Sequence, residues 1–205
     1  FPESLISLSG RYGRTFAYLH DISCFILIVL FGRIMRVFLL EVFVSLTKIC
    51  FVCLGNIVRS PLGENMFKHL AQQSGVADHY RVDSAGTGSW HVGEAPDQRM
   101  RRVAAKHGLK YDGRARQFRQ SDFDKFDLII AMDIENRANL LRLANSKMDA
   151  AKIQLMRNFD PQAGPNQSVP DPYYGGIDGF EEVFTIVERS CQGLLDSLEN
   201  NRAKQ

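Results

Sequence analysis

The chain has 205 residues, of which 45% are apolar and 23% are charged, a composition typical of one globular domain or a domain with a short appendage. This composition excludes disordered, collagen-like and repeat proteins. With 25 basic and 23 acidic residues the net charge is +2, too small to favour nucleic acid or an anionic membrane as partner. The few cysteines are too irregularly spaced for a disulfide scaffold, so we expect a reducing, cytoplasmic environment. They are Cys24, Cys50, Cys53 and Cys191.

Residues 1–46 differ in composition from the rest of the chain. They are rich in phenylalanine and contain no lysine, and residues 22–32 carry no charge. Arg33, Arg36 and Glu41 interrupt the apolar run that follows, and a charge near the centre of a membrane helix costs roughly 2.5–3.5 kcal/mol. The segment is therefore a poor spanning helix. Three interpretations stay open: a weak signal anchor, an amphipathic or partner-docking extension, or sequence upstream of the functional protein. We exclude it from the predicted fold, and any membrane contact is expected through it alone.

From Thr47 onward, short apolar runs alternate with longer stretches of helical periodicity, which is typical of βα units around a parallel sheet. The apolar runs predict strands over residues 48–53, 81–85, 126–132 and 152–156. The periodic stretches predict helices over residues 61–73, 96–107, 133–143 and 180–198. Residues 160–179 are rich in proline, glycine and asparagine and predict a long loop, a kind of segment that is often functional.

The first predicted strand is followed by the segment Cys53-Leu54-Gly55-Asn56-Ile57-Val58-Arg59-Ser60. The spacing between cysteine and arginine leaves enough chain for the backbone to curl, so that successive N–H groups point inward and form a ring of donors. The amino terminus of the next helix closes this ring. Such a ring of donors binds phosphate, and the Arg59 guanidinium adds a planar, two-pronged grip on phosphate oxygens. Gly55 offers the backbone freedom that the curl requires. We therefore predict that residues 54–60 form a phosphate-binding loop.

Cys53 stands at the base of this loop, where the donors that hold a phosphate also favour a thiolate. A thiolate under a bound phosphate is placed for in-line attack on phosphorus, which predicts a covalent phosphocysteine. Ser60 is expected to donate a hydrogen bond to the sulfur when water later displaces it. Cys50 forms a C-x-x-C pair with Cys53, but that redox motif opens a helix whereas this pair lies in a strand. We interpret Cys50 as a strand residue that fills space.

The long loop contains a candidate acid. Hydrolysis of a phosphate ester needs a proton for the departing oxygen and then a base for the attacking water. Asp171 lies between Pro170 and Pro172, which stiffen the backbone around it, and Tyr173 and Tyr174 follow as an aromatic wall. A solvated turn also explains such residues, but the phosphate-binding loop favours the functional interpretation.

Together these two motifs resemble those of the low-molecular-weight protein tyrosine phosphatases, which share a Cys-x-Gly-Asn-x-x-Arg-Ser loop and a later Asp-Pro-Tyr-Tyr-Gly segment. The resemblance covers residues 47–200, with further matches at residues 83–87, 107–108 and 131–133. It implies a three-layer αβα fold with a four-stranded parallel sheet, so that residues 47–205 are the phosphatase domain. It also implies catalysis without metal or cofactor. The implied substrates are phosphotyrosine-containing proteins and small aryl phosphates. Independently of the resemblance, we expect no nucleic-acid partner, and a monomer or weak dimer as the oligomeric state.

The resemblance also implies individual roles. Cys53 is the nucleophile, Arg59 the clamp on the phosphate and the transition state, and Asp171 the general acid and then the base. The residues that match the network supporting the loop are Asn56, Ser60, Ser84 and His107. The residues that match the walls of the substrate cleft are Leu54, Ile57, Trp90, Tyr173 and Tyr174. From the sequence alone, His107 also fits a helix end, Trp90 an ordinary aromatic residue and Ser84 a turn.

Val58 stands where many family members carry a second cysteine that forms a protective disulfide with the nucleophile. We therefore expect peroxide inactivation to be reversed only by an external thiol or by a route through Cys50.

Three alternative functions share parts of this pattern. Arsenate reductases of the same fold need two further cysteines downstream, and the chain has none between Cys53 and Cys191. Phosphoarginine phosphatases tend to carry threonine at the position of Ile57, so the branched apolar residue favours phosphotyrosine. A silent phosphotyrosine-binding module has no need of the nucleophile or of Asp171, and both are present.

Overall fold

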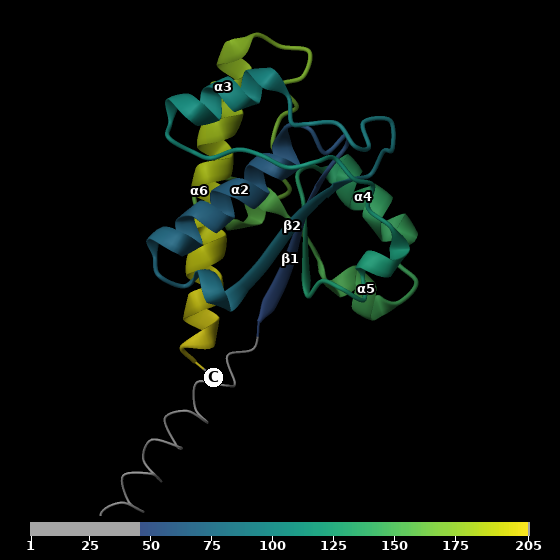
Figure 1. The fold of residues 1–205 in the computed structure, drawn as a ribbon. Coiled ribbons are helices and arrows are strands. Elements are labelled where there is room, and N and C mark those ends of the chain that lie inside the picture. The colour runs from purple at the N-terminus through teal and green to yellow at the C-terminus, as the bar shows by residue number, and fades with distance from the viewer. Residues whose placement is uncertain (1–45, 205) are drawn as a thin grey trace, which may run out of the picture. The chain divides into compact units, whose positions relative to one another are not determined.

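The computed structural model describes residues 46–204 (Figure 1). Its middle layer is a sheet of four parallel strands, β1 (Thr47–Cys53), β2 (Tyr80–Gly86), β3 (Leu128–Ala131) and β4 (Ile153–Leu155). Their order is β2-β1-β3-β4, which places β1 between β2 and β3. The predicted four-stranded parallel sheet is therefore confirmed. Strand β3 is shorter than the predicted strand over residues 126–132, because the buried Phe126 and Met132 extend the apolar run beyond the ends of the strand.

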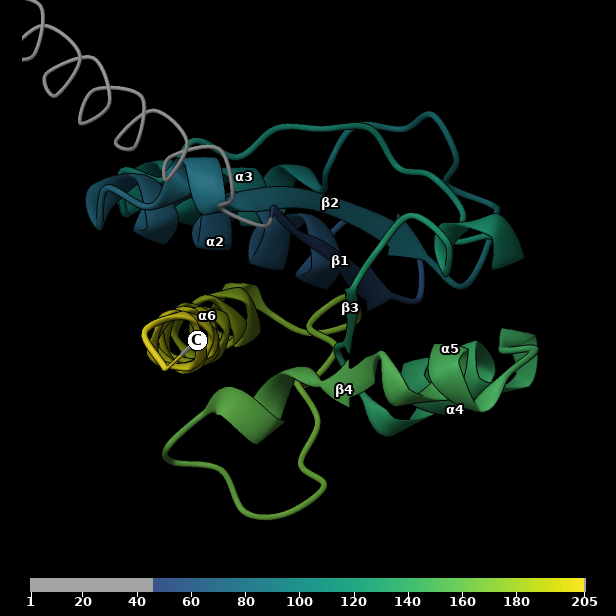
Figure 2. The same cartoon turned by 90° about the horizontal axis from the view of Figure 1, so that it is seen from below.

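Helices cover both faces of the sheet, as Figure 2 shows. On one side lie α2 (Arg59–Gln73), α3 (Gln98–Lys106) and α6 (Ile177–Arg202), and on the other lie α4 (Ile134–Leu143) and α5 (Lys147–Ala151). This arrangement confirms the three-layer αβα fold. Short 3₁₀ helices span Ala77–His79, Gln120–Asp122 and Met156–Phe159. Helix α5 was not predicted, because it depends on a capping box between Ser146 and Asp149 and has no buried apolar stripe.

The central strand β1 is buried on both faces. Ile49, Phe51 and Cys53 belong to the core beneath α2 and α6, whereas Cys50 and Val52 belong to the core on the other side. A strand covered on both faces carries a continuous apolar run, and this explains its clear sequence signal. The covered strand gives the segment that follows Cys53 a fixed starting point.

The long loop predicted over residues 160–179 is irregular as far as residue 176. Helix α6 begins at Ile177, about one turn before the start of its buried apolar stripe at Phe180. Among the described residues, no helix is long and apolar enough to cross a membrane. The expectations for residues 1–46 fall outside the described residues, except at Leu46.

Candidate active site

The segment between β1 and α2 curls around the end of β1. Its start is fixed to the chain beyond β2, because the N–H groups of Thr87 and Gly88 donate to the carbonyls of Cys53 and Leu54 at 2.9 and 2.8 Å. The left-handed residue of the curl is Asn56, with φ 57°, and not Gly55 as the sequence suggested.

Gly55 is needed for a different reason. A Cβ at this position would lie 2.9 Å from Cδ2 of His91, so the small residue lets the imidazole ring pack on the loop. The role of this glycine is therefore close approach rather than backbone conformation.

The Cys53 side chain is 3% exposed and its sulfur faces two donors from the same loop. Sγ lies 3.0 Å from Oγ of Ser60 and accepts a hydrogen bond from the N–H of Asn56 at 3.3 Å. The Ser60 hydroxyl can also donate to the carbonyl of Ala85 at 3.2 Å, so one proton has two acceptors, the carbonyl and the sulfur. Both loop donors can stabilise negative charge on the sulfur.

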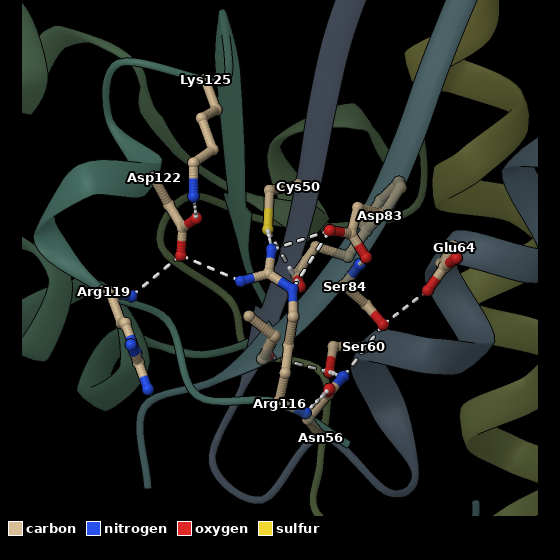
Figure 3. A network of polar contacts seen from close by, with 12 residues as sticks. Cys50, Asn56, Ser60, Glu64, Asp83, Ser84, Arg116, Arg119, Asp122 and Lys125 are labelled. Carbon is tan, nitrogen blue, oxygen red and sulfur yellow. Dashed lines mark hydrogen bonds and ion pairs between the residues drawn. The ribbon is translucent and has the colours of Figure 1, made fainter. Parts of the chain in front are cut away.

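Asn56 connects the loop to the rest of the domain. Its Nδ2 donates to Oγ of Ser60 and to Oγ of Ser84, each at 2.9 Å, while its Oδ1 accepts from the N–H of Arg116 at 2.9 Å. The Ser84 hydroxyl in turn donates to Glu64 at 2.6 Å (Figure 3). The structure thus brings Asn56, Ser60 and Ser84 together behind the loop, as the resemblance implied.

Figure 3 shows Arg116 between Asn56 and the side chains of Cys50, Asp83 and Asp122. Its guanidinium pairs with Asp83 and Asp122, each at 2.9 Å, and Nη2 lies 3.7 Å from Sγ of Cys50. Burial raises the pKa of the Cys50 thiol well above its ordinary value, against the lowering effect of Arg116. Hydrophobic periodicity could not have identified Arg116 as a site residue, because it lies in an irregular segment.

The Arg59 side chain is buried, with 4% of its surface exposed. Nη2 pairs with Asp171 and Nη1 with Asp133, each at 2.6 Å, and Nη1 also donates to the carbonyl of Val169 at 3.1 Å. The pair between Arg59 and Asp171 shows that the long loop over residues 160–176 reaches the phosphate-binding loop.

Asp133 lies in a segment that matched the family in the sequence, but no role was assigned to it there. Its position at the carboxyl end of β3, where the ends of parallel strands meet, was the signal available.

These groups open into one cavity of about 190 Å³. The residues that line it are Cys53, Leu54, Gly55, Ile57, Val58, Arg59, Trp90, His91, Asp171, Tyr173 and Tyr174. Trp90 is 63% exposed and Tyr174 is 96% exposed, so the rim is aromatic and open to a large substrate. His91 is the lining residue that the sequence did not suggest.

Comparison with known proteins agrees with this geometry. A sequence model described as low molecular weight phosphotyrosine protein phosphatase matches residues 48–204. A low molecular weight protein-tyrosine-phosphatase of Streptomyces coelicolor is 49% identical over 149 residues, which are 72% of this chain and 91% of that protein. The crystal structure of a protein tyrosine phosphatase from Entamoeba histolytica matches with a TM-score of 0.73 and 41% identity, over 76% of this chain and 99% of that one. A Drosophila arginine phosphatase structure matches with a TM-score of 0.69 and 34% identity, over 74% and 98% of the two chains.

The chain belongs to the low molecular weight protein tyrosine phosphatase family. This membership confirms the resemblance drawn from the two motifs, together with the fold class and the enzyme class that it implied. The chain is a protein tyrosine phosphatase and acts on phosphoproteins.

One residue assignment within this phosphatase is wrong. His107 does not reach the phosphate-binding loop, because its Nε2 lies 2.8 Å from Glu181 and its ring stacks on Phe184 at 4.3 Å between centroids. Both partners belong to α6, and His107 itself is the C-terminal cap of α3. The alternative interpretation of His107, as a residue at the end of a helix, is the correct one.

Two further residues of the phosphatase support the loop and were missed. The buried Tyr111 hydroxyl donates to the carbonyls of Ile57 and Val58 at 3.2 and 2.8 Å. Burial raises the pKa of this phenol well above its ordinary value, so it stays a donor. Gly86 lies against the loop, and a Cβ there would stand 2.8 Å from the carbonyl oxygen of Leu54. Neither contact has a local sequence signature, because both join segments that are distant in the chain.

Proposed function

We propose that the phosphatase hydrolyses phosphotyrosine in proteins, and small aryl phosphates, through a phosphocysteine formed on Cys53. The observation that carries this proposal is that Cys53, Arg59 and Asp171 line one cavity, in which Asp171 pairs with the Arg59 guanidinium at 2.6 Å. A phosphate that enters this cavity meets the loop backbone and the guanidinium together.

The first step transfers the phosphoryl group to the enzyme. The Cys53 thiolate attacks phosphorus, the bond to the phenolic oxygen breaks, and Asp171 gives its proton to that oxygen. Asp133 and Asp171 both pair with Arg59, but only Asp171 lines the cavity. Asp171 is also the more exposed of the two carboxyls, which favours it over Asp133 as the acid.

The second step releases phosphate. Asp171, now a carboxylate, takes a proton from water, the water oxygen attacks phosphorus, and the sulfur leaves as a thiolate. Ser60 can turn its hydroxyl proton from the carbonyl of Ala85 to the departing sulfur, because both acceptors are within reach. The N–H of Asn56 supplies a second hydrogen bond to that sulfur.

The aromatic rim supports phosphotyrosine as the substrate. Trp90, Tyr173 and Tyr174 present apolar faces to a planar ring in the cavity, and Ile57 adds a branched apolar wall. Because an arginine phosphatase shares the fold, this choice of substrate is decided by assay and not by the fold.

We further propose that the enzyme works in the cytoplasm as a monomer or weak dimer. Cys50, Cys53 and Cys191 are free thiols in the described part of the chain, which suits a reducing compartment.

The test compares matched phosphotyrosine and phosphoarginine peptides with the wild type, Cys53→Ser and Asp171→Ala. We expect hydrolysis of the phosphotyrosine peptide, complete loss in Cys53→Ser with binding retained, and a phosphate adduct on Cys53 after acid quenching of the wild type. Preference for phosphoarginine would overturn the substrate assignment. Turnover by Cys53→Ser above a few per cent would overturn the mechanism.

A further inference from the structure

Arg99, in the first turn of α3, connects two parts of the active site and has no role in the proposed function. Its Nη1 donates to the carbonyl of Tyr173 at 2.9 Å, so this side chain reaches the loop that carries Asp171. The same guanidinium donates from Nε and Nη2 to the two carboxylate oxygens of Asp97, at 3.1 and 2.7 Å.

Asp97 connects this arginine to the phosphate-binding loop. Its N–H donates to the carbonyl of Ile57 at 2.8 Å, and its Oδ1 accepts from the N–H of Arg99 at 2.7 Å as the cap of α3. At the other end of the connection, the N–H of Tyr173 donates to Oδ1 of Asp171 at 3.2 Å. A continuous series of contacts therefore runs from Ile57 to Asp171.

The plane of the Arg99 guanidinium is also fixed by aromatic rings. Its Cζ lies 4.6 Å from the ring centroid of Phe180, which is fully buried in α6, and 5.2 Å from that of Tyr173. The Asp97 side chain is only 12% exposed, and its hydrogen bond raises the pKa of Arg99. Lysine cannot reproduce this combination of a forked hydrogen bond and ring stacking.

We propose that Arg99 is a positioning residue for the general acid, because it holds the Tyr173 carbonyl and thereby sets the distance between Asp171 and the phosphate-binding loop. This inference rests on the proposed function of Asp171 as the acid. Proton donation matters most when the leaving phenol is a poor leaving group, so a displaced acid slows poor substrates more than good ones. A role in folding alone would slow all substrates equally.

The experiment measures kcat/KM for dinitrophenyl, nitrophenyl and phenyl phosphate, since this parameter includes the step that releases the phenol. For Arg99→Met we expect a loss of about tenfold or more with phenyl phosphate and about threefold or less with dinitrophenyl phosphate. Arg102→Met removes an exposed arginine from the same helix and is expected to leave all three values unchanged. Equal loss on the three substrates in Arg99→Met would overturn the inference.

Asp171→Ala separates this inference from the proposed function. If Asp171→Ala shows no dependence on the leaving group, the acid itself is misassigned and the proposed function fails with it. If Asp171→Ala shows that dependence and Arg99→Met does not, only the inference about Arg99 fails. In the double variant we expect the same dependence as in Asp171→Ala alone, because Arg99 acts through that residue. A steeper dependence in the double variant would contradict this.

Arg99→Lys keeps the test valid if Arg99→Met does not fold. It retains the charge and the aliphatic stem but loses the fork, so we expect an intermediate dependence on the leaving group with a circular dichroism spectrum like that of the wild type. A dependence identical to that of the wild type would overturn the inference.

Discussion

Cys50 and Cys53 lie three positions apart on β1, and their side chains point to opposite faces of the sheet. Cys53 belongs to the core beneath α2, and Cys50 to the core on the other side. A disulfide requires two β-carbons that face one another at about 4 Å, which this arrangement prevents. Cys191 is buried in α6, where its thiol contacts the carbonyl of Gly63. The route through Cys50 that the sequence left open is therefore closed.

We predict that peroxide converts Cys53 to its sulfenic acid without forming a disulfide to Cys50 or Cys191. Activity is expected to return with dithiothreitol and to show the same recovery in Cys50→Ala. Peptide mapping by mass spectrometry after oxidation checks this. A disulfide between Cys53 and Cys50 or Cys191 would contradict it, and so would slower recovery in Cys50→Ala.

Gly86→Ala is expected to displace the phosphate-binding loop. The added methyl would stand 2.8 Å from the carbonyl oxygen of Leu54 and 3.1 Å from the nitrogen of Asn56, both of which are backbone atoms that cannot move aside locally. A displacement approaching 1 Å in an active site costs up to about 100-fold in rate, so we expect kcat/KM for nitrophenyl phosphate to fall by about tenfold to 100-fold. Gly164→Ala, where the nearest atoms belong to the flexible Gln167 side chain, is the control and should retain wild-type activity. Unchanged activity in Gly86→Ala would show that the loop tolerates the methyl group.

Tyr111→Phe removes a single oxygen beneath the phosphate-binding loop and leaves the ring in place. The carbonyls of Ile57 and Val58 lose one of their two donors, which we expect to lower the free energy of unfolding by about 0.5–1.5 kcal/mol and kcat/KM by about threefold or more. Tyr80→Phe is the matched control, because its hydroxyl donates to Glu199 and contacts no loop residue. Urea unfolding and steady-state assays of both variants check the prediction. Equal losses of activity in the two variants would contradict it.

The sequence predicted the parts of this protein that depend on local patterns. The strands, the helices α2, α3, α4 and α6 and the loop from Cys53 to Ser60 each have a signal within a few residues, either periodicity or spacing. Asp133, Tyr111 and Arg116 were missed because their contacts join separate segments that only the folded sheet brings together.

His107 shows the opposite error. A histidine next to a glycine matched a family landmark, but nothing in its neighbourhood indicates which element it faces. The structure places it against Glu181 and Phe184 of α6. A motif match therefore fixed the position of this residue along the chain and not its direction in the fold.

Asp160 is expected to make the stability of the enzyme sensitive to acid. Its side chain is fully buried and accepts from Arg189 at 2.5 and 2.8 Å, with Arg157 at 3.1 Å. The hydrogen bonds from Arg189 hold the pKa of Asp160 below its usual value of 3.8, despite the opposing effect of burial. Because the folded-state pKa lies below the unfolded-state pKa, the carboxylate stabilises the fold above that usual value. This stabilisation is lost as the pH falls through the folded-state pKa.

Asp160→Asn is therefore expected to cost about 3 kcal/mol at neutral pH, since it leaves Arg189 without its partner, and to flatten the decline of stability in acid. Urea unfolding at neutral pH and at several values below about pH 4 measures both effects. Asp196→Asn, an exposed substitution on α6, serves as the control and should follow the wild-type curve. If Asp160→Asn loses stability in acid as steeply as the wild type, other carboxylates govern the acid limit and the proton linkage assigned to Asp160 is wrong.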